Sequence, residues 1–142
     1  MSTDRQWIAS VEIEIPFHDV DSVNIVWHGH YAKYLEIARC RLLESFDYNY
    51  PQMRDSGYVW PVIDIRLRYV APARFQQLIR VDARLDEWEH RLKISYVIYD
   101  ALSGKRITKG YSVQVAVDAD TGEMQLVSPN ILYQKLGLGS PE

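Results

Sequence analysis

Apolar and polar residues alternate along most of this chain, with the two-residue period typical of strands that have one buried and one solvated face. The first such segment covers 7–15, where apolar side chains alternate with Glu12 and Glu14. Pro16 ends it, and turn-forming residues separate the later segments. The pattern predicts four further strands, over 62–70, 78–87, 91–98 and 107–117.

Between the first two strands the period changes to three and four residues, which predicts a helix over 30–46. Two shorter helical segments are predicted over 48–56 and 129–136. The long helix has a continuous apolar face, formed by Tyr31, Leu35, Ala38, Leu42 and Phe46.

This order of elements predicts an α+β fold in a single domain over 1–142. We expect an antiparallel sheet of about five strands, four of them in meander-like succession, wrapped around one long central helix. The sheet face away from the helix is expected to meet water or a polar partner. It carries charged residues: Asp64, Arg66, Arg68, Arg80, Asp82 and Arg84.

Composition and charge narrow the function classes. The 142 residues are 47% hydrophobic, and the formal net charge is −3 with both signs interspersed, so the basic surface of a nucleic-acid binder is absent. No apolar run is long enough to span a bilayer, and the polar stretch 1–6 lacks signal-peptide character. Cys40 is the single cysteine, so no intramolecular disulfide forms, which fits a cytoplasmic protein.

The segment between the first strand and the long helix has no periodicity but is rich in reactive side chains. It holds Asp19 and Asp21, followed by His28 and Gly29 where the helix is about to begin. A helix N-terminus offers unpaired N–H donors and a partial positive charge, which suit an oxyanion. A carboxylate that folds back toward this end can attack a carbonyl or activate water.

The stretch FHDVDSVNIVWHGHYAKYLE, over 17–36, resembles the signature of the 4-hydroxybenzoyl-CoA thioesterase family. In that family a D-x-D pair precedes a hydrophobic run and then N-Y at the start of a long helix. The element order is similar to the family's hotdog fold, and YVAPA over 69–73 resembles its strand-end turn. Two departures are His30, where many members have Asn, and Val23-Asn24, where small or Gly residues are common.

The resemblance implies a thioesterase without a cofactor, which hydrolyses an acyl or aroyl thioester of coenzyme A, or of an acyl carrier protein, to free acid and thiol. It implies that Asp21 is the nucleophile or general base and that the backbone amides near His28 and Gly29 hold the thioester carbonyl. It also implies a homodimer, commonly doubled to a homotetramer, with the sites at the dimer interface.

Further residues are candidates for substrate binding. His30 and Tyr31 follow the reactive segment directly, and the imidazole of His28 is placed to orient Asp21 or the substrate. Asp19 is interpreted as a structural loop residue. The candidates for the phosphates of coenzyme A are Arg66 and Arg68, with their planar guanidinium groups, and His90 and Arg91 in a predicted turn.

Three other functions remain open from the residues alone. The same fold supports hydration or dehydration of an acyl thioester, with His28 paired to Asp21. A non-catalytic module that binds acyl-CoA or an acyl carrier would show no turnover. A metal hydrolase is the third, because Asp and His residues gather within 18–30, although their spacing fits no zinc template and we expect no metal.

Overall fold

The computed structural model describes residues 7–139, so the polar stretch 1–6 discussed above lies outside the described residues. The five long strands and the one long helix follow each other along the chain in the predicted order. The elements are β1 (Ile8–Glu14), short 3-10 helices at Phe17–Asp19 and His28–His30, α1 (Tyr31–Ser45), α2 (Tyr50–Asp55), β2 (Tyr58–Val59), β3 (Val62–Tyr69), β4 (Leu78–Glu87), β5 (Leu92–Asp100), β6 (Arg106–Gln114), β7 (Val117–Asp118) and α3 (Asn130–Lys135).

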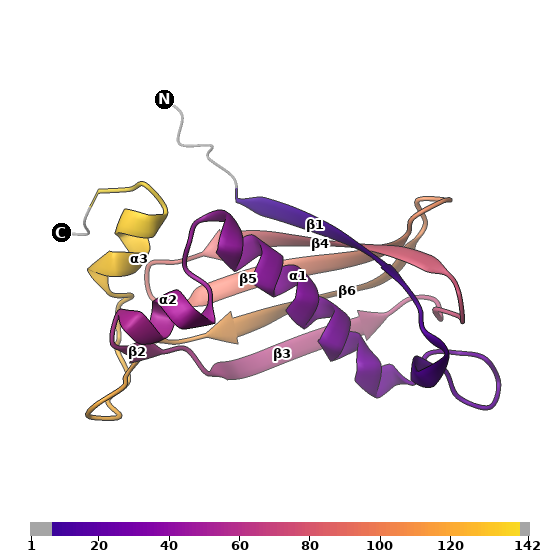
Figure 1. Cartoon of the computed structure of the whole chain (residues 1–142), viewed down its shortest axis with the longest axis horizontal. Coiled ribbons are helices and arrows are strands. Elements are labelled where there is room, and N and C mark those ends of the chain that lie inside the picture. The colour runs from indigo at the N-terminus through magenta and orange to yellow at the C-terminus, as the bar shows by residue number, and fades with distance from the viewer. Residues whose placement is uncertain (1–6, 140–142) are drawn as a thin grey trace.

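A five-stranded antiparallel sheet forms one layer, in the order β1-β4-β5-β6-β3. The long helix α1 lies across one face of this sheet, and α2 and α3 lie at its far end (Figure 1). The predicted α+β architecture of about five strands and one long helix is confirmed.

The expected meander is correct for β4, β5 and β6 but wrong for β3. Strand β3 pairs with β6 at the opposite edge of the sheet from β1. The segment that connects β3 to β4 therefore crosses the end of the sheet instead of making a tight turn. On its way, Ala73 accepts a hydrogen bond from the Val26 amide at 2.9 Å.

The strand predicted over 107–117 is also divided in two. Strand β6 ends at Gln114, and β7 pairs with β2 in a separate two-stranded sheet. The side chain of Gln114 is buried and donates to the carbonyl of Trp60 at 2.8 Å. This polar contact lies at the point where the chain leaves the main sheet.

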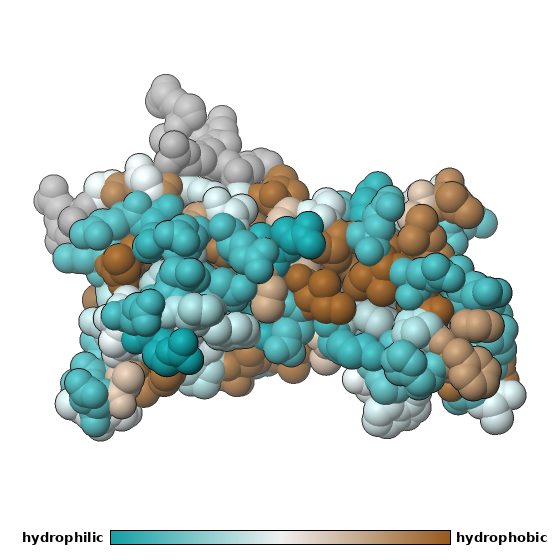
Figure 2. Space-filling view, viewed as in Figure 1, coloured by the Kyte–Doolittle hydropathy of each residue, from teal (hydrophilic) through white to brown (hydrophobic). Residues whose placement is uncertain are grey.

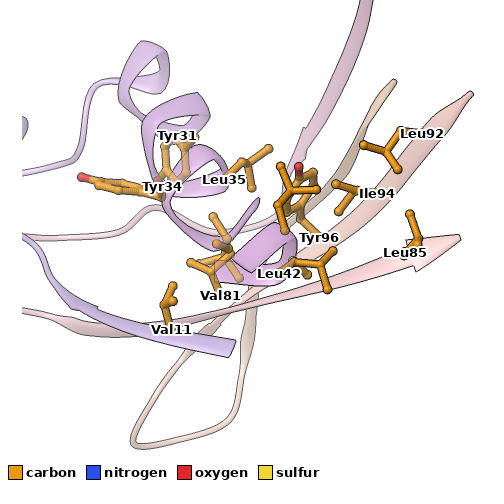
Figure 3. Close-up of a cluster of buried hydrophobic side chains, with 14 of the residues drawn as sticks. Val11, Tyr31, Tyr34, Leu35, Leu42, Val81, Leu85, Leu92, Ile94 and Tyr96 are labelled. Atoms are coloured by element: carbon orange, nitrogen blue, oxygen red, sulfur yellow. The ribbon is translucent and has the colours of Figure 1, made fainter. Parts of the chain in front are cut away.

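The core lies between α1 and the sheet. All five residues of the predicted helical face are buried, and Figure 3 shows Leu35 and Leu42 of α1 among strand residues such as Val81 and Ile94. Each fully buried side chain of this size stabilises the fold by roughly 1.5–3 kcal/mol. Within residues 7–139, none of the helices combines the length and the apolar character that a membrane span requires.

Sheet edge β3 is left with an apolar surface. Ile63 and Ile65 are 57% and 45% exposed, and Val62 is 41% exposed. On the helix side of the molecule, Figure 2 shows further apolar side chains gathered beside the middle of α1. An exposed sheet edge with apolar side chains is a site where another strand can pair.

Candidate active site

The segment between β1 and α1 folds as a compact loop beside the N-terminal end of α1 (Figure 1). The amide of Asp21 donates to the Ile25 carbonyl at 2.9 Å, and the amide of Asn24 donates to the Asp21 carbonyl at 3.0 Å. Asn24 has a positive φ of 65°, and Asn tolerates this left-handed conformation better than most residues. Asn24 can therefore serve at a position where a Gly would otherwise be favoured.

Asp19 attaches this loop to α1. Its carboxylate is buried and accepts hydrogen bonds of 2.6 Å from Lys33 Nζ and from the Tyr34 hydroxyl, both on α1. Lys33 bonds to Oδ1 of Asp19, and two imidazole nitrogens approach this oxygen, that of His18 at 3.6 Å and that of His30 at 3.9 Å. The interpretation of Asp19 as structural agrees with this burial.

Two influences act in opposite directions on the pKa of Asp19. Burial by itself raises the pKa of this carboxyl, but the hydrogen bonds from Lys33 and Tyr34 and the Lys33 charge outweigh it, so the pKa is lowered overall. The same contact raises the pKa of Tyr34, which is first of all buried and next to an anion. At neutral pH Asp19 is therefore ionised, and its carboxylate acts only as a hydrogen-bond acceptor.

Asp21, two residues further on, has the opposite environment. Its side chain is exposed, and Oδ1 accepts hydrogen bonds from the amides of Val23 at 2.9 Å and Ile25 at 3.3 Å. Oδ2 has no hydrogen-bond partner in the part of the chain that the structure describes. One oxygen thus fixes the side chain, and the other is open to a ligand.

The start of α1 provides amide donors. His28–His30 form a 3-10 turn that leads into the helix, and within residues 7–139 the amides of His28 and Gly29 have no backbone or side-chain acceptor. Such orphan N–H groups are the usual anion-binding feature of a helix N-terminus.

Tyr69 at the end of β3 belongs to the strand-end turn noted in the sequence, but the sequence did not mark it as a site residue. Its hydroxyl donates to the carbonyl of His28 at 3.0 Å, and the Tyr31 amide donates to the same carbonyl. In a trans peptide unit the C=O and N–H groups point in opposite directions. The two donors to His28 therefore also fix the direction of the Gly29 N–H.

Aromatic rings surround this peptide. The Trp27 ring is half exposed and lies 5.1 Å from the His28 ring and 5.4 Å from the His30 ring, centroid to centroid. It also covers Gly29, because a Cβ at position 29 would lie 2.2 Å from a Trp27 ring atom. Tyr31 is buried, and its hydroxyl accepts a hydrogen bond from the Ala73 amide at 3.1 Å.

The four phosphate candidates do not form one cluster with Asp21. Arg91 makes a bidentate pair with Glu87, at 2.9 and 3.2 Å, and the His90 ring contacts the Leu126 carbonyl at 3.3 Å. Arg66 and Arg68 line a depression on the sheet face opposite α1. Among the described residues, no group of three or more His, Cys, Asp or Glu side chains is arranged to hold a metal ion.

Comparison with known proteins identifies the family of this chain. Residues 15–134 match the family model of the thioesterase-like superfamily. Over 115 residues the chain is 25% identical to "Putative acyl-CoA thioesterase YneP" of Bacillus subtilis. The aligned region covers 80% of this chain and 83% of that protein.

Two solved structures share the architecture. The hypothetical protein TT1821 of Thermus thermophilus is 28% identical, with a TM-score of 0.79 over 91% of this chain and 97% of that one. Slr0204 of Synechocystis, a 1,4-dihydroxy-2-naphthoyl-CoA thioesterase, is 16% identical, with a TM-score of 0.81 over 92% and 96% of the two chains, and shows the fold alone. The chain belongs to the thioesterase-like superfamily and has its hotdog fold.

Proposed function

We propose that this protein is an acyl-CoA thioesterase in which Asp21 supplies the catalytic carboxylate and the amides of His28 and Gly29 bind the thioester oxygen. The observation that carries the proposal is the pairing of two features at one end of α1. The Asp21 carboxylate is held with one oxygen free, and the amides of His28 and Gly29, in the turn that leads into α1, have no acceptor among the described residues. Membership of the thioesterase-like superfamily supports the reaction class.

The reaction requires little else. Asp21 either attacks the thioester carbon directly or takes a proton from a water molecule that attacks it. Negative charge then develops on the carbonyl oxygen, where the helix-start amides stabilise it. The carbon–sulfur bond breaks, and the thiolate leaves and takes up a proton, so that thioester and water give acid and thiol.

The site is proposed to be completed by a second copy of the chain. Asp21 and the amides lie at the surface of one chain, while the apolar edge strand β3 is open along Val62–Tyr69. Pairing of two β3 strands would bury Ile63 and Ile65 and place a second chain beside the Tyr69 end of the strand. His30 and Tyr31, next to this end, remain candidates for positioning the acyl group.

The proposed reaction is tested by measuring free-thiol release from a panel of acyl-CoA, aroyl-CoA and acyl-carrier thioesters. We expect thiol release from at least one coenzyme A thioester, by a protein that light scattering shows to be a dimer or larger. Enoyl thioesters should be included, because their hydration changes absorbance without releasing thiol. Hydration of an enoyl thioester in the absence of thiol release would show that the protein is a hydratase and not a thioesterase.

Tyr69→Phe is expected to lower kcat about 2–10-fold with little change in KM. Loss of one exposed hydrogen bond is worth roughly 0.5–1.5 kcal/mol, and here the loss releases the peptide that carries the Gly29 N–H. Steady-state kinetics on the best substrate measures the effect. Tyr99→Phe, which removes a hydroxyl from the other face of the sheet, serves as the matched control, and equal kcat values for the two variants would refute the positioning role.

A further inference from the structure

Charged side chains on the sheet face opposite α1 are mostly arranged in pairs. Each pair joins a strand cation to a neighbouring carboxylate, so the charges compensate locally. The pairs are Arg80 with Asp82 at 3.1 Å, Arg84 with Asp86 at 2.9 Å, Arg91 with Glu87 at 2.9 Å and Lys93 with Glu87 at 3.8 Å.

Four cations on β3 and β6 have no such carboxylate partner within residues 7–139, and three of them, Arg66, Arg68 and Lys109, lie together. Within residues 7–139, Arg66, Arg68 and Lys109 have no carboxylate in ion-pair distance and no hydrogen bond from their side chains. Arg68 lies directly opposite Lys109 in the strand register. Like charges in directly opposed cross-strand positions are destabilising, so this arrangement is unfavourable unless an anion lies between them.

The same three side chains line a depression of about 350 Å³. Tyr111 and Ser95 supply a ring and a hydroxyl to its lining. Two carboxylates border it: the Ser95 hydroxyl donates to Asp86, which is already paired with Arg84, and Asp64 is 3.5 Å from the Tyr111 hydroxyl. Lys93 lies over the Tyr111 ring at 4.7 Å. The volume is in the range of small-molecule sites, and the lining combines positive charge with a flat aromatic surface.

We propose that Arg66, Arg68 and Lys109 form a binding site for the phosphate groups of a nucleotide, on the sheet face opposite the thioester chemistry. Two guanidinium forks and an ammonium group match phosphate oxygens in charge and geometry. A local depression with three cations close together fits a small phosphorylated molecule better than an extended macromolecular surface. The site accepts nucleoside phosphates from either of two sources, the nucleotide end of a coenzyme A thioester or a free nucleotide.

The first source rests on the proposed function, whereas the site itself does not. Arg66 and Arg68 are on β3, whose last residue, Tyr69, contacts the peptide at the helix start. Arg68 and Tyr69 are adjacent in sequence and point to opposite faces of the sheet. The phosphate site and the thioester site therefore lie on either side of one strand end.

Equilibrium titration tests the site on the full chain, with no thioester present. The probes are coenzyme A, 3′-dephospho-coenzyme A, ADP and pyrophosphate, each at low and at high salt. We expect the Arg66→Gln/Arg68→Gln double variant and Lys109→Gln each to bind coenzyme A at least about tenfold more weakly than wild type, because hydrogen bonds to charged groups are lost. High salt should weaken wild-type binding.

Arg80→Gln is the matched control, since it removes one cation from the same sheet face, and its partner Asp82 bonds to Ser10, which does not line the depression. It should bind coenzyme A as wild type does. Because removal of Lys109 relieves repulsion from Arg68, the unliganded Lys109→Gln protein should melt no earlier than wild type, and coenzyme A should raise Tm in wild type but not in this variant.

The pattern of probes separates the two sources. Tighter binding of coenzyme A than of its dephospho form and ADP assigns the site to the thioester's own nucleotide, and equal binding of coenzyme A and ADP assigns it to a free nucleotide. Absence of binding by all four probes, or equal losses in Arg80→Gln and in the depression variants, would overturn the proposal. Neither result depends on the role of Asp21, so a failure of the proposed hydrolysis is recognised separately.

Discussion

Asp21→Asn should release thiol from the best acyl-CoA substrate at least about 100-fold more slowly than wild type. A positioned general base typically contributes 10²–10⁴-fold to a rate, and the amide of Asn cannot act as a base or as a comparable nucleophile. The amide oxygen of Asn can still accept the hydrogen bonds from Val23 and Ile25 that position the Asp21 side chain. The substitution therefore removes the charge and leaves the loop in place.

The kinetic signature of this variant is a loss in kcat with a small change in KM, measured by thiol release over a range of substrate concentrations. Asp55→Asn, an exposed carboxylate at the end of α2, is the control and should keep full activity. Comparable rates for Asp21→Asn and wild type would remove the catalytic assignment. Loss of activity in Asp19→Asn but not in Asp21→Asn would instead move it to Asp19.

Asp19→Ala is expected to lower the free energy of unfolding by about 2–3 kcal/mol. The substitution leaves the buried Tyr34 hydroxyl without its acceptor and Lys33 without its counter-ion. An unsatisfied buried polar group costs about 1–3 kcal/mol, and the partial exposure of Lys33 keeps the ionic part small. Urea unfolding at neutral pH, followed by tryptophan fluorescence, measures the difference.

The stability difference between wild type and Asp19→Ala should become smaller in acid. The pKa of Asp19 is lowered in the folded protein, so its ionised form stabilises the fold at pH values above the unfolded pKa, near 3.9. This contribution is lost as the pH falls through the lower folded value. The gap between wild type and Asp19→Ala should be constant from pH 7 to about 5 and shrink below about pH 4. A gap that stays the same in acid would contradict the ionic role.

Much of the fold could be predicted from the sequence because burial follows simple periods. The helical face from Tyr31 to Phe46 and the alternation in β4 and β5 both match the observed burial. The pairing of β3 was not predictable in this way. Strand order depends on where a connection passes, and the apolar–polar pattern of a strand is the same whichever neighbour it has.

The candidate site was predicted in part. The loop with Asp21 and the helix start with His28 and Gly29 lie within ten residues of sequence, so that both belong to one segment could be inferred, whereas their catalytic roles stay predictions. Tyr69 lies far along the chain, and nothing in its alternating strand marks the hydroxyl that reaches the His28 carbonyl. Lys109 was missed for a similar reason, because the cross-strand register that places it opposite Arg68 is not written in either strand alone.

The contacts between the reactive loop and the crossing segment join early residues of the chain to residues that are synthesised later. The amide of Val26 bonds to Ala73, that of Ile15 bonds to Gln77, and the Tyr31 hydroxyl accepts from Ala73. A nascent chain that ends before residue 73 already contains Asp21 and the whole of α1, together with the hydrogen bonds inside the loop, but lacks the backbone partners in 73–77. The residues of the candidate site are therefore made early on the ribosome, and their loop gains these contacts after the chain has passed from β3 toward β4.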